Sequence, residues 1–321
     1  MKIKTKPRII LLFALIFVFY LYYILPSVIS WGPIDNYRNF SVRTTVNVTD
    51  AMPEIVNITC NNGTAITLNA GTVYPVICKI ELKDYNGGNT LNGTGSSGVN
   101  ASTFYYYLNA SEDPDDNNVH YTNSTCEVNG TAFANYSINW TCTFYTWYYA
   151  NNGTWIINIT VHDRYNGRSY NVTGTRNATI GSLYAVNVTN VIDFGDMYVG
   201  ETSTTSVEAN ITNFGNMDIN ISLYGFGGEN QTLYPDLAMV CAVRNLSLDT
   251  ERYSVNGSEA WAAMTPISGT PTALPNMTLI QQQDDSTPVM NATYWRLYID
   301  PISNPFGQCN GTVIFSAESA I

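Results

Sequence analysis

Charge is scarce in this sequence, and most of it is negative. Charged residues make up 12% of the 321 residues, and the formal net charge at pH 7 is −11. Four of the 14 basic residues lie within the first eight positions, and no Lys/Arg cluster follows them. Nucleic-acid binding depends on clustered basic side chains that neutralise phosphates. We therefore exclude nucleic acid as a partner.

Combinations of catalytic residues are also missing. The two histidines, His120 and His162, have no paired Ser or Cys nucleophile in a recognisable setting, and the adjacent acids Asp115 and Asp116 are too local to define a glycosidase site. The cysteines never occur with CxxC spacing, which disfavours a zinc–thiolate site. We expect no enzymatic activity and no cofactor, apart from the calcium candidate described below.

Two short motifs match enzyme signatures but lack the context that those signatures require. Gly93, Gly95 and Gly98 have the GxGxxG spacing of dinucleotide-binding loops, yet no predicted helix follows them. The triplet Asp193-Phe-Gly195 matches the metal-binding triplet of kinases, without the glycine-rich strand or catalytic loop of that family. We interpret the first as a flexible loop and the second as the end of a strand.

Helical periodicity is absent after the N-terminal segment, and period-two alternation takes its place. Trp155, Ile157, Ile159 and Val161 share one face of a predicted strand, while Asn158 lies on the other face. Asn158 begins an Asn-Ile-Thr sequon, so the outward-facing side chain is one that can carry a sugar. The same unit recurs along the chain, which predicts β-sandwiches with apolar inner faces and glycan acceptors outside.

Sequons are more frequent than composition explains. The chain holds 37 Asn and 58 Ser plus Thr, for which chance predicts about 7 sequons. About 24 occur, none with proline in the middle. This excess favours N-glycosylation over accident. The acceptors within the recurring strand unit are Asn47, Asn57, Asn139, Asn158, Asn171, Asn187, Asn210 and Asn220.

Turn signals roughly every 8–12 residues divide residues 51–182 into about seven predicted strands, as expected for an immunoglobulin-like sandwich. Residues 103–109 and 169–180 are two of these strands, and residues 89–102 are a predicted loop. A second domain, residues 183–321, has a weaker pattern in its middle, residues 226–290, and a closing strand at 309–317. The predicted inward-facing side chains are Val56, Ile58, Cys60, Val76, Cys78, Ile80, Leu82, Tyr136, Ile138, Trp140, Cys142 and Phe144 in the first domain, and Val207, Ala209, Ile211, Ile219, Ile221, Leu223, Trp295, Leu297 and Ile299 in the second.

The N-terminus has the layout of an export segment. Four basic residues precede an apolar run, residues 9–25, which ends at Pro26. Two interpretations stay open. Cleavage after Ser30 would release a secreted protein, whereas an uncleaved run would anchor the chain in the membrane with everything after about residue 30 outside. Residues 31–50 are then a tether, and both interpretations predict a cell-surface location, membrane-anchored or secreted.

An even number of cysteines in an exported chain predicts disulfides. Four of the six precede residue 145 and two follow residue 240. Three pairings are open among the first four. The favoured pairs are Cys241–Cys309, which follows if bridges stay within domains, and Cys60–Cys78 with Cys126–Cys142, by sequence proximity.

An acidic loop at residues 113–118 is a candidate calcium site. Asp113, Asp115 and Asp116 offer carboxylates close together, and Ca²⁺ takes six to eight oxygen ligands. Asp84 and Asp163, both near predicted strand ends, could add to the site if the fold brings them close. The spacing matches no EF-hand, and the same residues are good turn formers, so a solvated turn remains the alternative.

Several motifs carry a resemblance to known surface proteins. In the first domain they are the Val-Ile-Cys-Lys strand at 76–79 and residues 120–126, 140–144 and 148–155, which resemble the immunoglobulin-like or polycystic-kidney-disease-like repeats of archaeal surface proteins. In the second domain, residues 192–195, 199–201, 211–216, 294–298 and 311–315 look like the hydin-type surface domain. The resemblance implies an exported structural or adhesive module and brings no catalytic residues with it.

Together these observations predict an all-β protein. It would have two tandem immunoglobulin-like β-sandwich domains, residues 51–182 and 183–321, after one N-terminal hydrophobic helix. We expect an exported, N-glycosylated structural or adhesive protein of the cell surface, whose partners are N-linked glycans, the membrane through residues 9–25 if uncleaved, and other surface proteins or itself. The alternative is a carbohydrate- or other ligand-binding surface protein that uses exposed aromatic side chains or a calcium-stabilised loop. Exposed rings at Tyr106 and Trp147 would favour it, and buried rings there would count against it.

Overall fold

The structure is a computed structural model of the chain, and it describes Leu15, Val18 and residues 42–123, 126–129, 136–170 and 177–320. The chain divides into two compact units, Met1–Thr49 and Asp50–Ile321. In the first unit, Leu15 and Val18 are helical, and residues 42–49 are exposed without regular secondary structure. The rest of the predicted export segment lies outside the described residues. None of the helices in the described part is long and apolar enough to cross a bilayer.

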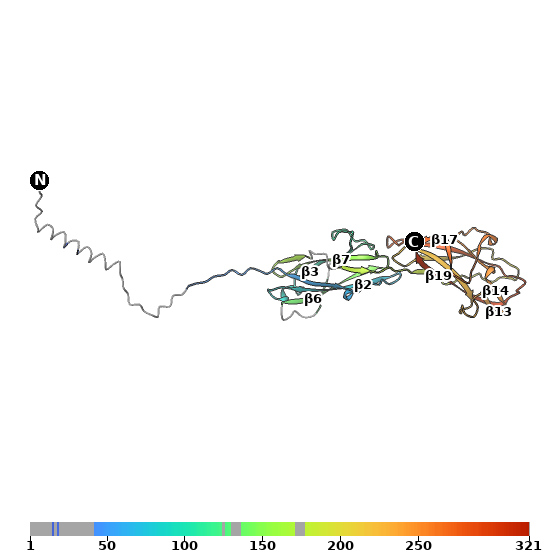
Figure 1. Ribbon diagram of the computed structural model, residues 1–321, viewed down its shortest axis with the longest axis horizontal. Coiled ribbons are helices and arrows are strands. Elements are labelled where there is room, and N and C mark those ends of the chain that lie inside the picture. Colours follow the sequence, from blue (N-terminus) through green and yellow to red (C-terminus); the bar gives the residue numbers. More distant parts are fainter. Residues whose placement is uncertain are drawn as a thin grey trace, which may run out of the picture. The chain divides into compact units, whose positions relative to one another are not determined.

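The second unit is built from antiparallel sheets, beginning with two that pack face to face. We call these two, which span residues 54–180, the first sheet pair (Figure 1). Short 3₁₀ turns, η1 (Asn61–Gly63) and η2 (Gly88–Leu91), lie in its connections. One sheet has the order β1 (Glu54–Cys60), β2 (Val73–Lys83), β6 (Ser137–Trp147), β5 (Glu127–Asn129); the other has the order β4 (His120–Asn123), β3 (Gly98–Tyr106), β7 (Gly153–His162), β8 (Arg168–Tyr170), with β9 (Asn177–Ile180) also pairing β7.

The core of the first sheet pair follows the alternation in the sequence. Every second residue of β2, β6 and β7 is buried, as the pleat of a strand with one solvated face requires. Phe104 lies between the two sheets, with its ring centroid 5.4 Å from that of Phe144 and 4.9 Å from that of Trp155. Fully burying one such aromatic side chain contributes about 1.5–3 kcal/mol. The sheets are therefore held together mainly by their shared apolar faces.

Two side chains predicted to face inward do not, and each has a local cause. Val56 is 42% exposed because β1 contains an irregularity between Ile55 and Asn57 in its pairing with β2, which reverses the faces on either side of it. Tyr136 is 49% exposed and has a left-handed φ of 68°, one residue before β6 begins at Ser137. The prediction was wrong at both positions, since alternation holds only where the pairing is regular.

The predicted glycine-rich loop at 89–102 is partly strand. β3 begins at Gly98, whose φ of 99° suits glycine, and an added Cβ would lie 2.1 Å from Cζ2 of Trp140. The Trp140 indole donates a hydrogen bond to the Leu91 carbonyl at 3.0 Å. Gly93 and Gly98 of the GxGxxG spacing therefore allow close packing over Trp140. The strand predicted at 169–180 is represented by β8 and β9, with residues 171–176 outside the described part.

Residues 186–319 form the second sheet pair. Two 3₁₀ turns, η3 (Leu248–Thr250) and η4 (Trp261–Ala263), accompany it, and β13 to β17 come from the stretch whose sequence pattern was weak. Its sheets are, first, β10 (Val186–Val188), β11 (Val207–Asn213), β18 (Met290–Leu297), β15 (Glu251–Ser254), β16 (Thr265–Pro266) and, second, β14 (Asn245–Ser247), β13 (Leu237–Val243), β19 (Phe306–Ser319), β12 (Ile219–Gly227), β17 (Thr272–Leu279).

A separate apolar core lies in the second sheet pair. Trp295 is fully buried, with Tyr253 5.4 Å away and Phe315 6.2 Å away between ring centroids. The predicted inward-facing residues of this region are buried, except Val207, which is half-buried. The described residues are thus all-β with several antiparallel sheets, as in a β-sandwich. The division into domains stays a prediction.

The three disulfides lie across neighbouring strands within a sheet. Because immunoglobulin domains place their conserved disulfide between the two sheets, this arrangement differs from that template. Disulfides persist in oxidising compartments, so the three bonds indicate an extracellular or secreted protein. The bonded pairs, which are those favoured from the sequence, are Cys60–Cys78 across β1 and β2, Cys126–Cys142 at the start of β5 and in β6, and Cys241–Cys309 across β13 and β19.

The two cores are separate but meet at a polar and aromatic junction. The ring centroids of Tyr148 and Phe214 are 5.5 Å apart. The side-chain amide of Asn216 donates to the carbonyls of Ala150 and Gly181, both at 3.0 Å. Residues 50–321 accordingly form one compact unit.

Candidate functional site

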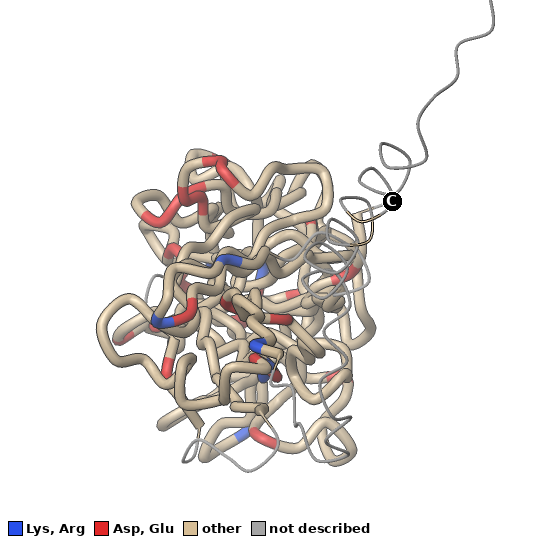
Figure 2. Tube along the Cα trace, turned by 90° about the vertical axis from the view of Figure 1, so that its left-hand side faces the viewer, with Lys and Arg blue, Asp and Glu red and all other residues tan. Residues whose placement is uncertain are grey.

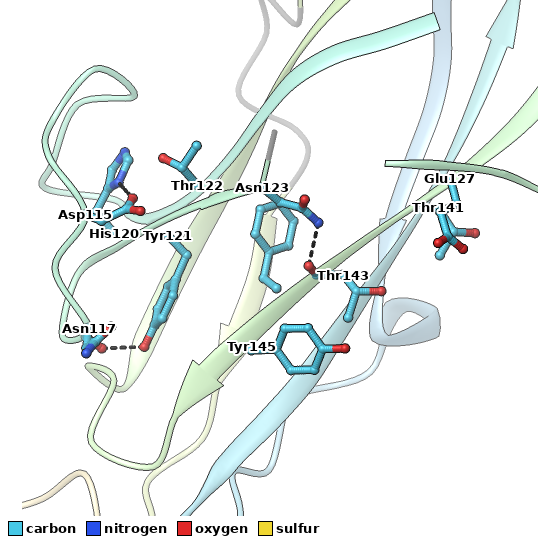
Figure 3. A pocket seen from close by; sticks show the side chains of 11 residues that line it. Asp115, Asn117, His120, Tyr121, Thr122, Asn123, Glu127, Thr141, Thr143 and Tyr145 are labelled. Carbon is cyan, nitrogen blue, oxygen red and sulfur yellow. Dashed lines mark hydrogen bonds and ion pairs between the residues drawn. The ribbon is translucent and has the colours of Figure 1, made fainter. Parts of the chain in front are cut away.

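A polar groove of about 510 Å³ opens beside the first sheet pair (Figure 3). It lies between β4, at the edge of one sheet, and β6 of the other sheet. β5 pairs with Asn139–Thr141 of β6, and among the described residues no strand covers the C-terminal half of β6 on that side. The residues that line the groove are Asp115, Asn117, His120, Tyr121, Thr122, Asn123, Glu127, Thr141, Thr143, Phe144 and Tyr145.

Side chains from β4 form hydrogen bonds with some of the backbone groups that are unpaired along this open edge of β6. The Asn123 amide donates to the Thr143 carbonyl at 2.6 Å, and the Tyr121 hydroxyl accepts from the Trp147 amide at 2.9 Å while donating to the Asn117 carbonyl. Burial raises the pKa of Tyr121, so its hydroxyl stays protonated and able to donate. These contacts block strand addition and leave a groove lined by hydroxyl and amide groups.

His120 stabilises the loop that forms one wall of the groove. Its ring is 1% exposed, with Nδ1 3.1 Å from Oδ1 of Asp115 and Nε2 3.3 Å from the Ser111 carbonyl. The Tyr105 ring stacks beside it at 6.1 Å between centroids. Both ring nitrogens are therefore engaged by loop oxygens, and neither is directed at a nucleophile. His162, at the end of β7, is half-buried.

The groove suits a polar ligand, and its lining includes the carboxylates of Asp115 and Glu127. Charged positions are sparse along the described trace (Figure 2), and most groups that line the groove are hydroxyls, amides and carbonyls. Tyr145 is 65% exposed, so its ring offers a flat apolar surface beside them. Sugars combine hydroxyl groups with a flat apolar face, which matches this lining.

The acidic loop does not bring its carboxylates together. Asp113 accepts from the Ala110 amide at 2.9 Å, Asp116 accepts from the Asn118 amide at 2.8 Å, and Asp115 faces His120. Each carboxylate thus stabilises a different part of the loop. Among the described residues, no group of three or more His, Cys, Asp or Glu side chains is placed to hold a metal ion. Asp84 and Asp163 lie elsewhere, at the ends of β2 and β7.

The aromatic residues chosen as a test of ligand binding pack inward. Tyr106 is half-buried with its ring edge-on to Trp155, and Trp147 is half-buried with its ring stacked on Tyr149 at 5.7 Å. Both pack against the first core. Ligand binding through these two rings therefore has no support, and the exposed aromatic side chain at the groove is Tyr145.

Most of the sequon asparagines chosen from the sequence face solvent. Asn158 is an exception, since it is half-buried in the middle of its sheet with its side-chain oxygen covered. Asn220 is also half-buried and accepts from the Thr278 hydroxyl at 2.7 Å. Asn171 lies outside the described residues. The exposed acceptors are Asn47, Asn57, Asn139, Asn187 and Asn210.

A second groove, of about 750 Å³, contains a buried acid that sequence reasoning missed. It lies between β10 and β19 in the second sheet pair, and Glu251 of β15 is among its lining residues with 3% of its surface exposed. Burial raises the pKa of Glu251 to about 8. The signal was present in the sequence, since Glu251 precedes Tyr253 by two positions and shares its inward face.

Comparisons with known proteins add little. No family model matches the chain, and no curated protein matches it. A solved structure of a DUF4466 family protein from Parabacteroides merdae ATCC 43184 is 8% identical to this chain and covers 78% of it and 100% of its own length, with a TM-score of 0.24. A TM-score this low carries no argument about fold or function.

Proposed function

We propose that this protein is an exported, N-glycosylated cell-surface protein with a structural or adhesive role and no catalytic activity. Two immunoglobulin-like domains, residues 51–182 and 183–321, follow an N-terminal hydrophobic helix that is either cleaved or kept as a membrane anchor. The resemblance to archaeal surface repeats supports this role.

The observation that carries the proposal is the placement of the sequon asparagines. Asn57, Asn139, Asn187 and Asn210 are exposed on strands whose opposite faces supply the two cores. Glycans attached there would shield sheet surfaces and edges from association with other strands. The disulfides would stabilise the folded shape outside the cell, where oxidising conditions preserve them.

The test is cross-linking on intact native cells, followed by mass spectrometry of the joined peptides and of glycan occupancy. We expect glycans at the exposed acceptors, and cross-links to surface proteins or between copies of this chain. A repeating pattern of self-links would identify a coat or filament subunit. An intracellular location, or bare asparagines at all exposed sequons, would overturn the proposal.

Carbohydrate binding is the second candidate function, and the polar groove beside Tyr145 favours it. A glycan array probed with the purified full chain would test it. We expect Tyr145→Ala to abolish binding and Tyr107→Ala, an exposed tyrosine outside the groove, to leave it unchanged. Equal loss in both variants, or no binding by the unmodified chain, would remove this function.

A further inference from the structure

The second groove, which has Glu251 among its lining residues, lies between two strands that each have an unpaired side. Within the described structure, β10 pairs only with β11, so it is an edge strand of its sheet. β19 pairs with β13 over residues 306–310 and with β12 over residues 311–319, and none of its residues pairs with two described strands. No backbone hydrogen bond joins β10 to β19 in the described part of the chain. Backbone donors and acceptors on both sides of the groove are therefore open to a further strand.

Apolar side chains line the groove, although they belong to the core of a sandwich. Val188 of β10 and Val313 and Phe315 of β19 pack against the second core but are only half-buried. Val191, in the segment after β10, lines the same groove with 67% of its surface exposed. Side chains that face the interior of a closed sandwich are normally covered by the opposite sheet. The two sheets thus stand open along this side.

The chain also carries a segment that has the pattern of a strand but no strand partner within the described structure. Residues 42–49 lack regular secondary structure, and six of these eight residues are β-branched. Val42, Val46 and Val48 lie on one face of the extended segment and are 83%, 85% and 81% exposed. β-Branched residues that alternate in this way are typical of strands with one buried face. The segment is therefore suited to join a sheet.

We propose that residues 42–49 of a second copy of this chain insert into this groove as an added strand. The incoming backbone would pair with the unpaired side of β19, as in other proteins that bind by adding a strand to an open sheet edge. Val46 and Val48 would cover the apolar lining beside Phe315. Asn47, a sequon acceptor, would then lie on the outward face of the added strand, where a glycan has room.

The segment and the groove match in length and in charge. Residues 308–315 of β19 line the groove, and residues 42–49 form a strand of the same length. The charged residues that line the groove are both acids, Asp193 and Glu251. The segment carries one charged residue, the basic Arg43. In a chain with a net charge of −11, this segment is thus one of the few that an acidic groove would not repel.

The length of the chain favours a second copy over the same molecule as the donor. Val46 lies eight residues before Glu54, so an extended chain carries it at most about 29 Å from there. Glu54 pairs with the last residue of β2, and β2 spans about 33 Å back to its first residue, Val73. The second sheet pair is joined at that far end, where the Gly71 amide donates to the Phe214 carbonyl at 3.3 Å. The groove lies beyond this junction and thus outside the reach of Val46 in its own chain.

Insertion would join copies head to tail. The donor segment precedes the first sheet pair and the groove belongs to the second, so the contact is heterologous and each copy offers one segment and one groove to its neighbours. The inference deepens the proposed structural role, on which it rests, by naming the partner as a second copy. A glycoprotein that reaches the cell surface but stays monomeric would overturn this inference and leave the surface role standing.

The first test measures self-association of the full chain, purified in detergent, by analytical ultracentrifugation over a range of concentrations. We expect dimers and longer species as the concentration rises. Val46→Asp should abolish them, because its carboxylate would enter the apolar groove. Thr45→Asp is the matched control, since it adds the same charge one position away on the outward face, and it should leave association unchanged. Both positions are exposed, so neither change should affect folding.

The second test mixes two defective variants. Val191→Asp changes an exposed residue of the groove and should block acceptance while it leaves the donor segment intact. Neither Val46→Asp nor Val191→Asp should associate alone. Mixed, they should form dimers that grow no further, because one copy donates its segment and the other supplies its groove.

A capped peptide of residues 42–49 locates the contact. It should bind the Val46→Asp chain and slow hydrogen exchange of backbone amides in residues 311–319. The same peptide with Val46→Asp should bind at least about tenfold more weakly. A monomer at every concentration, equal loss of association in Thr45→Asp, or no dimers in the mixture would overturn the proposal. Slow exchange in residues 311–319 of a monomeric chain would show that another part of the same molecule fills the groove, and would overturn it too.

Discussion

The hydroxyl of Tyr148 donates a hydrogen bond to Oε1 of Gln282, and this contact joins the first sheet pair to the second. Both side chains are almost fully buried, at 4% and 3% exposure. The side-chain amide of Asn118 donates to the Gln282 backbone carbonyl at 2.8 Å, so Gln282 is held at two points. Because buried polar groups are expensive to leave unpaired, this junction should be specific in geometry.

Tyr148→Phe should lower the free energy of unfolding by about 1–3 kcal/mol, since it leaves the buried Gln282 oxygen without its donor. Tyr145→Phe, which removes the hydroxyl of an exposed tyrosine, is the control and should change stability by less than about 0.5 kcal/mol. Urea unfolding followed by circular dichroism measures both. Equal effects would show that the junction hydrogen bond contributes nothing specific.

Glu251 should make stability depend on pH. Its pKa lies at about 8 in the folded protein, above its ordinary value of 4.5, because burial disfavours the charged form. Between these values the folded state binds more protons than the unfolded state, so stability should fall as pH rises through this window. Glu251→Gln should flatten that fall. Unfolding midpoints from pH 4.5 to 8.5 for both proteins test this, and parallel curves would contradict it.

The disulfides should differ in their contribution to stability. Cys241–Cys309 spans 68 residues and Cys126–Cys142 spans 16. In the chain-entropy account, removing the disulfide that closes the longer loop lowers the free energy of unfolding by about 4.4 kcal/mol. Removing the one that closes the shorter loop lowers it by about 3.1 kcal/mol. Double Cys→Ala variants, compared by denaturant unfolding, should keep this order. The reverse order would mean that local packing outweighs loop closure.

Gly98→Ala should be strongly destabilising, because a Cβ would lie 2.1 Å from the Trp140 ring. Gly95→Ala is matched to it, since Gly95 also has a positive φ of 69° but nothing lies within 4 Å of an added Cβ. Gly95→Ala should lower the free energy of unfolding by about 1 kcal/mol through backbone strain alone. Gly98→Ala should lower it by at least about 2 kcal/mol more. Thermal unfolding separates the two, and similar midpoints would show that the ring moves aside freely.

The long alternating strands could be predicted from the sequence because burial of one face dictates their pattern. β2, β6 and β7 were expected with the correct inward residues, apart from Tyr136, which adopts a left-handed backbone just before β6. Val56 failed because the pairing of β1 with β2 is irregular there. Neither the left-handed backbone nor the irregular pairing changes the hydrophobic pattern of the sequence.

Contacts between distant segments could not be predicted in the same way. β13 to β17 are short and interrupted by turns, so their pattern is brief. The groove beside Tyr145 arises because β5 begins only at Glu127, opposite Thr141 of β6, which only the three-dimensional pairing shows.

The Cys60–Cys78 bond has a mechanical consequence. A pulling force that enters through the N-terminal segment reaches β1 first and would unzip it from β2 residue by residue. At Cys60 the covalent bond passes the force directly to Cys78, so the enclosed residues, 61–77, carry no tension. Cys78 lies opposite Cys142 on β6, and Cys142 is bonded to Cys126. The two disulfides therefore lie side by side across the sheet. Extension under force would therefore stop after about six residues, and the rest of the sheet would have to break as a unit.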